Sequence, residues 1–156
     1  KDVMSVFDLL RNRPPIIQGG TFNANPVSMV AGLAAMELLT PETFDRLNGL
    51  GTLARALMAE AFAAAGARGN VTGMGSVFRF QLTDRTVSDY RTSYLDAAEK
   101  QKIEWLWRYL LNNGILINKA GIVALSTVTT EAEINILVET VLAGLNEMQS
   151  EGIAAE

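Results

Sequence analysis

The segment that most restricts the fold is residues 26–39, which read as a helix that is apolar almost all round. Pro26 can open a helix after an asparagine, and no polar face follows it. Its large apolar side chains are Val27, Met29, Val30, Leu33, Met36 and Leu38. Such a helix needs cover on every side, and a chain of 156 residues offers little of it. We therefore expect this helix to belong to a larger domain or to a subunit interface.

The rest of the chain alternates between helical and extended patterns. Helical spacing covers residues 41–65, 97–112 and 130–147, and extended patterns cover residues 77–82, 115–118 and 122–126. A capping box, Thr130 with Glu133, starts the last helix, and we expect that helix to fray from Met148 onward. This order predicts an α/β fold of the α+β kind, in which a small, at least partly antiparallel sheet carries helices on one face. A domain boundary is expected near residues 39–41.

The clearest predicted strand, at residues 77–82, alternates in character. Phe78 and Phe80 share the face that should meet the core, whereas Arg79 and Gln81 point to the other, wetter face. Arg79 is therefore either a solvated strand residue or an arginine that binds a substrate carboxylate.

Aromatic residues mark the loop and the helix that follow this strand. The polar stretch at residues 83–96 has no sustained period and reads as a surface loop. Its tyrosines, Tyr90 and Tyr94, either line a substrate entrance or hold the loop against the domain. In the next helix, Trp105 and Tyr109 form a second apolar stripe. That stripe packs either on another domain or subunit or on a wide surface of the same core.

The composition excludes several classes of function. The chain has no cysteine and no histidine, so disulfides, thiolate nucleophiles, imidazole bases and the usual zinc sites are absent, and we predict no metal site. A balance of 13 basic against 17 acidic residues, without a basic run, argues against nucleic acid or an anionic membrane as a partner. No apolar run reaches the length of a membrane span, and no signal-peptide pattern opens the chain. A cytoplasmic location is the expectation.

The junction before the apolar helix carries the strongest functional signal. Gly19 and Gly20 free the backbone, Thr21 adds a hydroxyl, and Asn25 can cap the helix. Exposed N–H groups at such a helix start favour an anion such as phosphate. The same residues also make an ordinary turn into a capped helix.

The order of residues at this junction resembles the phosphate-side segment of the class III pyridoxal-phosphate aminotransferases, and within them the glutamate-1-semialdehyde aminomutase group. The matching residues are Gly19-Gly20-Thr21-Phe22-Asn23-Ala24-Asn25-Pro26. Further matches follow in the same order: Thr72-Gly73-Met74-Gly75-Ser76, Asn113-Gly114-Ile115, Ala124-Leu125-Ser126 and Thr130-Glu131-Ala132-Glu133. The resemblance spans nearly the whole chain.

This resemblance implies the C-terminal part of a fold-type-I pyridoxal-phosphate transferase. Residues 1–40 would be the end of the large domain, residues 41–150 the small domain, and residues 151–156 a frayed tail. The cofactor implied is pyridoxal 5'-phosphate, whose phosphate would be held by Gly20, Thr21 and Phe22 while the neighbouring subunit binds most of the molecule. A homodimer and a small amino-acid or amino-ketone substrate follow from the same resemblance.

The resemblance also implies what the chain lacks. In the family, the lysine that carries the cofactor and the aspartate that pairs with its pyridine nitrogen lie upstream of the Gly-Gly-Thr segment. No lysine of this chain matches that motif, so we predict no catalytic residue here and no activity for this fragment alone. Gln18 departs from the histidine that many relatives carry before the glycine pair.

Two questions stay open at the level of sequence. Lys119 lies at the tip of the predicted hairpin, where it is either solvated or in contact with substrate. The residues do not separate an aminomutase from an aminotransferase. The alternative of another class is a non-catalytic α/β binding or self-association module.

Overall fold

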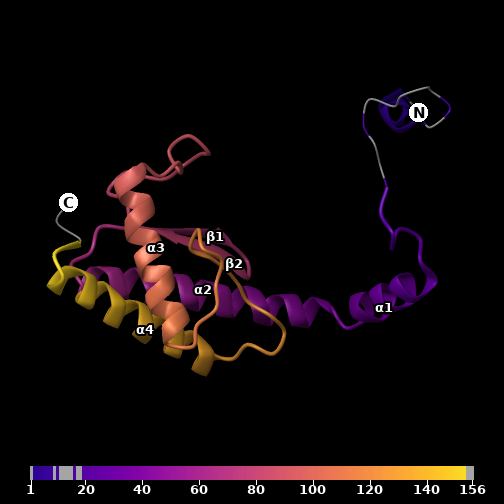
Figure 1. The fold of residues 1–156 in the computed structure, drawn as a ribbon. Helices are drawn as coiled ribbons and strands as arrows, with labels where there is room; N and C mark the ends of the chain where they lie inside the picture. Colours follow the sequence, from indigo (N-terminus) through magenta and orange to yellow (C-terminus); the bar gives the residue numbers. More distant parts are fainter. Residues whose placement is uncertain (1, 9, 11–15, 17–18, 154–156) are drawn as a thin grey trace. The chain divides into compact units, whose positions relative to one another are not determined.

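The computed structural model describes residues 2–8, 10, 16 and 19–153, and the chain divides into two compact units, Lys1–Thr40 and Pro41–Glu156 (Figure 1). Gln18 and residues 154–156 lie outside the described residues. The first unit holds the 3-10 helix η1 (Asp2–Phe7) and helix α1 (Pro26–Glu37). The second unit holds α2 (Pro41–Ala64), β1 (Asn70–Met74), β2 (Val77–Gln81), α3 (Ala97–Asn112), β3 (Ile122–Ala124) and α4 (Glu131–Ser150). The assignment of these units to a large and a small domain stays a prediction.

The predicted apolar helix is confirmed as α1, and it begins where the sequence indicated. The Asn25 side chain accepts hydrogen bonds from the backbone N–H groups of Val27, at 3.0 Å, and Ser28, at 3.2 Å. No residue of α1 is buried, and Val27 and Leu33 are 77% and 60% exposed. The cover that such a helix needs is therefore not supplied by the described residues.

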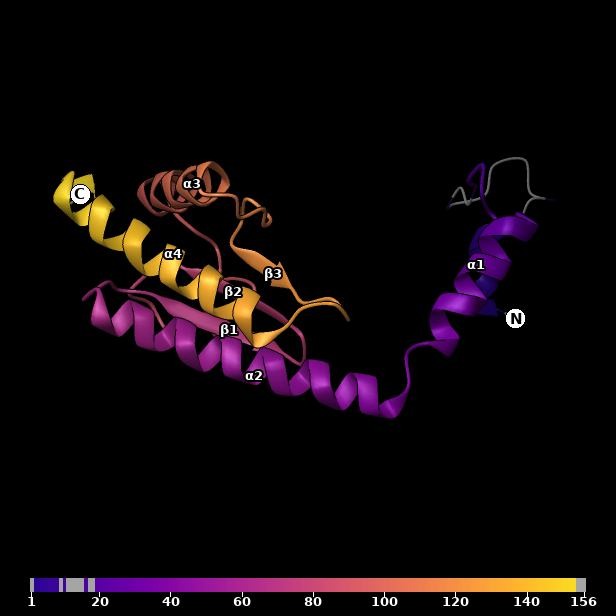
Figure 2. The ribbon, with the colours of Figure 1, turned by 90° about the horizontal axis from the view of Figure 1, so that it is seen from below.

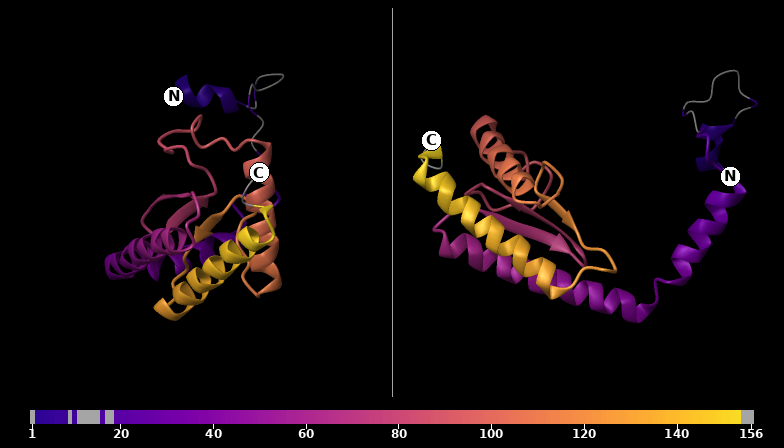
Figure 3. Two further views of the ribbon diagram at one scale, coloured as in Figure 1. Left: turned by 90° about the vertical axis from the view of Figure 1, so that its left-hand side faces the viewer. Right: turned by 60° about the horizontal axis from the view of Figure 1, so that its bottom comes forward.

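The second unit is built on a three-stranded antiparallel sheet in the order β1-β2-β3. Figures 2 and 3 show α2 and α4 side by side along the sheet, with α3 next to α4. The central strand β2 carries Phe78 and Phe80 into the core between sheet and helices, and both are fully buried. The helices complete this core with Met58, Leu106, Leu110, Ile134, Val141 and Leu145. The predicted helices at 41–65, 97–112 and 130–147 and the strand at 77–82 are confirmed within a few residues.

Two glycines let α2 approach the turn between β1 and β2. Met74 pairs with Val77 across a two-residue turn, and Gly75 takes a positive φ of 56°, which glycine adopts at little cost. A Cβ on Gly51 of α2 would lie 2.0 Å from the Gly75 carbonyl oxygen. Arg55 donates to that oxygen at 2.7 Å. Gly75 of the Thr72-Gly73-Met74-Gly75-Ser76 motif and Gly51 of α2 therefore permit a close contact between the helix and the hairpin.

The second aromatic stripe of α3 packs within the same unit. The rings of Trp105 and Tyr109 are stacked, with centroids 5.6 Å apart and an interplanar angle of 12°. Trp105 packs against the core, and a Cβ on Gly144 of α4 would lie 2.8 Å from the Tyr109 ring. Of the two explanations, the wide surface of the same core is the one that the structure supports.

The predicted strand at residues 115–118 is wrong. Ile115 donates instead to the carbonyl of Leu110, and Asn118 begins a turn in which its side chain accepts from Ala120 N–H. Gly121 closes the turn with a φ of 77° and donates to the Asn118 carbonyl. Because these local bonds use the backbone groups that a strand would need, residues 115–118 form no strand, and the pairing with β2 on this side is limited to Ile122–Ala124. The partner on the other side, β1, was missed because Gly73 within it conceals the extended pattern.

Two further expectations need correction. Helix α4 does not fray from Met148 onward, because Met148 is 2% exposed and the helix continues to Ser150. Gln81 is not on a wet face, because it is 1% exposed and donates to the Ser93 carbonyl at 2.9 Å. The loop before α3 covers this end of the sheet.

Candidate functional site

The turn at Gly20, Thr21 and Phe22 belongs to the first unit and is exposed. The carbonyls of Gly20 and Phe22 accept from the N–H groups of Asn23, at 3.0 Å, and Asn25, at 3.2 Å. The N–H groups of Gly20, Thr21 and Phe22 donate to none of the described residues. Ala24 follows with a positive φ of 55°, unusual for a residue with a side chain. The turn therefore presents three backbone donors and the Thr21 hydroxyl to the surroundings.

The first turn of α1 has no N–H group left to donate to an anion. Pro26 has no N–H, and the next two N–H groups are already bonded to the Asn25 side chain. The free donors lie instead in the preceding turn. Three N–H groups and a hydroxyl suit the acceptor oxygens of a phosphate, so the donor set of Gly20, Thr21 and Phe22 fits such a group.

A pocket of about 550 Å³ in the second unit brings together Arg79 and Lys119, the two substrate-contact candidates. β2 carries Arg79 on the face of the sheet opposite Phe78 and Phe80, and the turn at residues 118–121 carries Lys119. We call this cavity the Arg79 pocket.

Arg79 is held with the tip of its side chain unpaired. Its Nε donates to the Ala120 carbonyl at 2.9 Å, and its two terminal Nη groups bond to none of the described residues. Burial lowers the pKa of the Arg79 guanidinium. A partly buried cation that lacks a carboxylate partner is unfavourable by itself, and a planar fork of N–H groups matches a carboxylate. Arg79 is thus the pocket's best anion-binding group.

Lys119 is not simply solvated. Its Nζ lies 3.0 Å from Glu104 Oε1, and Arg108 shares the same carboxylate at 2.8 Å. Hydrogen bonds from Lys119, then from Arg108, lower the pKa of Glu104. Lys119 also lies 5.9 Å from the centre of the Trp107 ring. Any anion that approaches Lys119 competes with Glu104.

The remaining lining of the Arg79 pocket comes from the loop and from α3. Tyr90 and Tyr94 line it, and their role at a substrate entrance stays a prediction. Lys100 and Glu104 also line it and were missed. They lie four residues apart on α3 and therefore on one face of that helix, beside the buried Ile103. This spacing was the sequence signal that could have identified them.

Two classes of site find no support in the described part of the chain. No group of three or more acidic residues there could hold a metal ion. None of its helices combines the length and apolar character of a membrane span.

Comparisons with known proteins identify the family. No family model matches the chain. A glutamate-1-semialdehyde 2,1-aminomutase of Lachnoclostridium phytofermentans is 34% identical over 108 residues, which cover 68% of this chain and 25% of the aminomutase. An omega-transaminase from Sphaerobacter thermophilus superposes with a TM-score of 0.80 at 44% identity over 95% of this chain and 34% of that structure. A transaminase with PLP bound gives a TM-score of 0.73 at 36% identity over 96% of this chain and 34% of its own.

These likenesses include both units, and the fold is that of the C-terminal part of fold-type-I transferases. The chain spans a quarter to a third of the length of the proteins it matches. Over that span, the chain belongs to the family of the pyridoxal-phosphate-dependent aminotransferases and glutamate-1-semialdehyde aminomutases.

Proposed function

We propose that a protein containing this chain is an aminotransferase or aminomutase that uses pyridoxal 5'-phosphate. The bound cofactor supplies the carrier for the amino group and the electron sink. The observation that carries the proposal is the set of donors at Gly20, Thr21 and Phe22 that none of the described residues accepts from, in a chain that superposes on a transaminase with PLP bound.

Thr21 and its neighbours hold the phosphate in this proposal. The N–H groups of Gly20, Thr21 and Phe22 and the Thr21 hydroxyl donate to the phosphate oxygens, because nothing else among the described residues uses them. The substrate is a small amino acid or amino ketone. Arg79 receives its carboxylate through the free Nη groups, and Lys119 supplies a second cation after it leaves Glu104.

A homodimer belongs to the same proposal. The phosphate held by the turn would belong to a cofactor bound mainly by the neighbouring subunit. Helix α1 is apolar and has no residue buried by the described part of the chain, which supports a contact with another domain or subunit directly after that turn. We also propose a cytoplasmic location for the parent protein.

The phosphate contact is testable on the 156-residue chain. We expect pyridoxal phosphate to shift the amide NMR signals of Gly20, Thr21 and Phe22, and pyridoxal without phosphate to leave them unchanged. Thr21→Val should weaken this response and Ser28→Ala, in the capped first turn of α1, should not. Equal responses to both compounds, or shifts confined to other residues, would contradict the phosphate site.

The expected inactivity of the chain by itself has a separate test. The chain is mixed with pyridoxal phosphate, reduced with borohydride and mapped by mass spectrometry. Slow, unselective labelling of several lysines is expected, because no lysine of this chain matches the family motif. Stoichiometric labelling of one lysine would contradict this part of the proposal.

A non-catalytic binding module is the second candidate. The observation in its favour is that the second unit closes its own core, with Leu106 and Leu110 fully buried. Such a module predicts a well-behaved monomer in sedimentation. Self-association that is lost when Leu33 of α1 is changed to Ser favours the transferase reading.

A further inference from the structure

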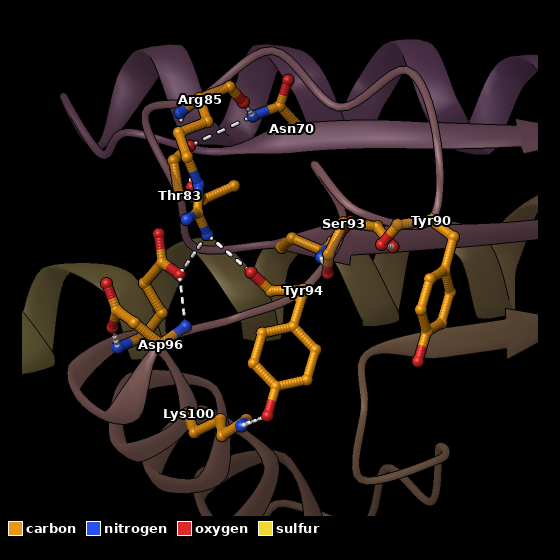
Figure 4. Close-up of polar contacts among 10 residues, drawn as sticks. Asn70, Thr83, Arg85, Tyr90, Ser93, Tyr94, Asp96 and Lys100 are labelled. Atoms are coloured by element: carbon orange, nitrogen blue, oxygen red, sulfur yellow. Dashed lines mark hydrogen bonds and ion pairs between the residues drawn. The ribbon is translucent and has the colours of Figure 1, made fainter.

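The loop between β2 and α3 forms one wall of the Arg79 pocket with two tyrosines. Tyr90 and Tyr94 line the pocket and are 83% and 60% exposed. Figure 4 shows both rings projecting from the loop on the same side. Rings with this exposure make few contacts within the chain, so their surfaces are available to a ligand. We call Tyr90 and Tyr94 the tyrosine wall.

Arg85 joins the backbone of this wall to the start of α3. Its Nη2 donates to the Tyr94 carbonyl at 2.8 Å and to Glu99 Oε2 at 2.5 Å (Figure 4). The Glu99 side chain is only 13% exposed, and it forms the capping box of α3 with Asp96. Arg85 therefore fixes the position of Tyr94 relative to a well-capped helix.

The sheet holds the two ends of the same loop. Asn70 of β1 donates through its side chain to the carbonyls of Thr83, at 3.1 Å, and Arg85, at 2.7 Å (Figure 4). Gln81 of β2 donates to the Ser93 carbonyl. These bonds use backbone acceptors of a segment without regular secondary structure, so they define one loop conformation.

The ring of Tyr94 is also held at its far end. Lys100 Nζ lies 3.2 Å from the Tyr94 hydroxyl and 4.2 Å from the ring centre. The backbone is thus tied by Arg85 and the hydroxyl by Lys100. A ring fixed at both ends offers a flat surface at a low entropic cost to a ligand.

We propose that Arg85 is a positioning residue for substrate selection: it holds Tyr94 so that the tyrosine wall contacts a planar apolar group attached to the carboxylate that Arg79 receives. This inference rests on the proposed role of Arg79. The ligand class is a small carboxylate with an aryl group, and a pocket of about 550 Å³ has room for one.

The test uses the 156-residue chain and three probe carboxylates. NMR titration measures the affinities for 3-phenylpropionate, 3-cyclohexylpropionate and butyrate, which differ in whether the apolar group is flat, bulky or small. Arg85→Gln should weaken 3-phenylpropionate about three- to tenfold, the range of an aromatic contact, and change butyrate less than about twofold. Arg68→Gln is the matched control, because it removes an exposed arginine paired with Asp84 outside this pocket.

A second variant covers the case in which Arg85→Gln disturbs the start of α3. Tyr94→Leu leaves the backbone acceptor of Arg85 in place, and it should abolish the preference for 3-phenylpropionate over 3-cyclohexylpropionate. An unchanged preference in Arg85→Gln would overturn the positioning role of Arg85, and an unchanged preference in Tyr94→Leu, or equal weakening of all three probes, would overturn the aromatic contact.

Failure of the proposed function gives a different result. Arg79→Gln should weaken all three carboxylates by about tenfold or more, as expected for a charge-assisted bidentate contact. If Arg79→Gln has no effect, the substrate contact of the proposed function is wrong. If Arg79→Gln weakens binding of the probes and Arg85→Gln does not, only the proposed positioning role of Arg85 is wrong.

Discussion

Helices α1 and α4 are both rich in apolar residues, yet they differ completely in burial. Helix α1 has no buried residue, whereas α4 buries a full stripe that includes Val141 and Leu145. The polar residues of α4 lie on one side, so its apolar stripe meets α2 and α3, while α1 has apolar side chains all round and none of its residues is buried by the described part of the chain. Apolar content alone therefore does not make a core; a partner surface must be within reach.

The largest predicted effect contrasts one leucine from each unit. Leu106→Ala should lower the free energy of unfolding by about 2–5 kcal/mol, because it opens a cavity at a fully buried position. Leu33→Ala should change it by less than about 0.5 kcal/mol, because Leu33 is exposed. Urea unfolding followed by tryptophan fluorescence reports on the second unit alone, since Trp105 and Trp107 are the two tryptophans of the chain. Equal losses in the two variants would mean that α1 is part of the same cooperative unit.

The next effect separates two glycines of α2. Gly51→Ala should cost about 1–3 kcal/mol, because the new methyl group collides with the Gly75 carbonyl and forces the hairpin away. Gly49→Ala is the control: apart from its chain neighbours and the backbone of its own helix, no atom lies within 4 Å of its Cβ position, so the higher helix propensity should stabilise by up to about 1 kcal/mol. Thermal unfolding measured by circular dichroism gives both values. A stabilising Gly51→Ala would refute the close contact between α2 and the β1–β2 turn.

A smaller effect compares the two helix caps. Thr130→Ala should lower the stability of the second unit by about 1 kcal/mol, because α4 loses its capping box and the helix is part of the core. Asn25→Ala should reduce helical circular dichroism from α1 but leave the tryptophan-detected midpoint unchanged. A shifted midpoint in Asn25→Ala would show that the first unit stabilises the second.

The smallest effect is a dependence on pH at the start of α4. Hydrogen bonds from Thr130 lower the pKa of Glu133 from its ordinary value of 4.5. A carboxyl group with a lowered pKa stabilises the fold above its unfolded pKa, and this stabilisation is lost as the pH falls through the folded value. The coupling between Thr130 and Glu133 in a double-mutant cycle should therefore be present at pH 7 and decrease as the pH falls below 4.5. Asn25 has no acidic residue in the first turn of α1 with which to couple. The effect of Asn25→Ala should therefore show no such change with pH.

Local patterns predicted most elements of the second unit because they depend on neighbours in the chain. The spacing around Leu106 and the Thr130–Glu133 capping box were sufficient for α3 and α4. The strand at residues 115–118 could not be predicted correctly, because the Asn118 side chain and Gly121 close a turn that competes with strand pairing. Gln81 was placed on a wet face because alternation along β2 does not show which loop folds over it.

In the candidate site too, the sequence identified individual residues, and only the fold showed how they are arranged. Arg79 and Lys119 were identified from a strand and a predicted turn 40 residues apart, and only the fold places them around one pocket. The donors at Gly20, Thr21 and Phe22 were named from the family resemblance, and the structure moves the available N–H groups from the start of α1 into the turn.

By itself, the sequence determined the helix starts, the core face of β2, the family and the lack of thiol and imidazole chemistry, since these follow from residue types and their spacing over a few positions. The tertiary structure alone decided which polar side chains end without a partner, because that depends on groups brought together from distant segments. The terminal Nη groups of Arg79, which bond to none of the described residues, and the hydrogen bond from Arg85 to the Tyr94 carbonyl are of this second kind.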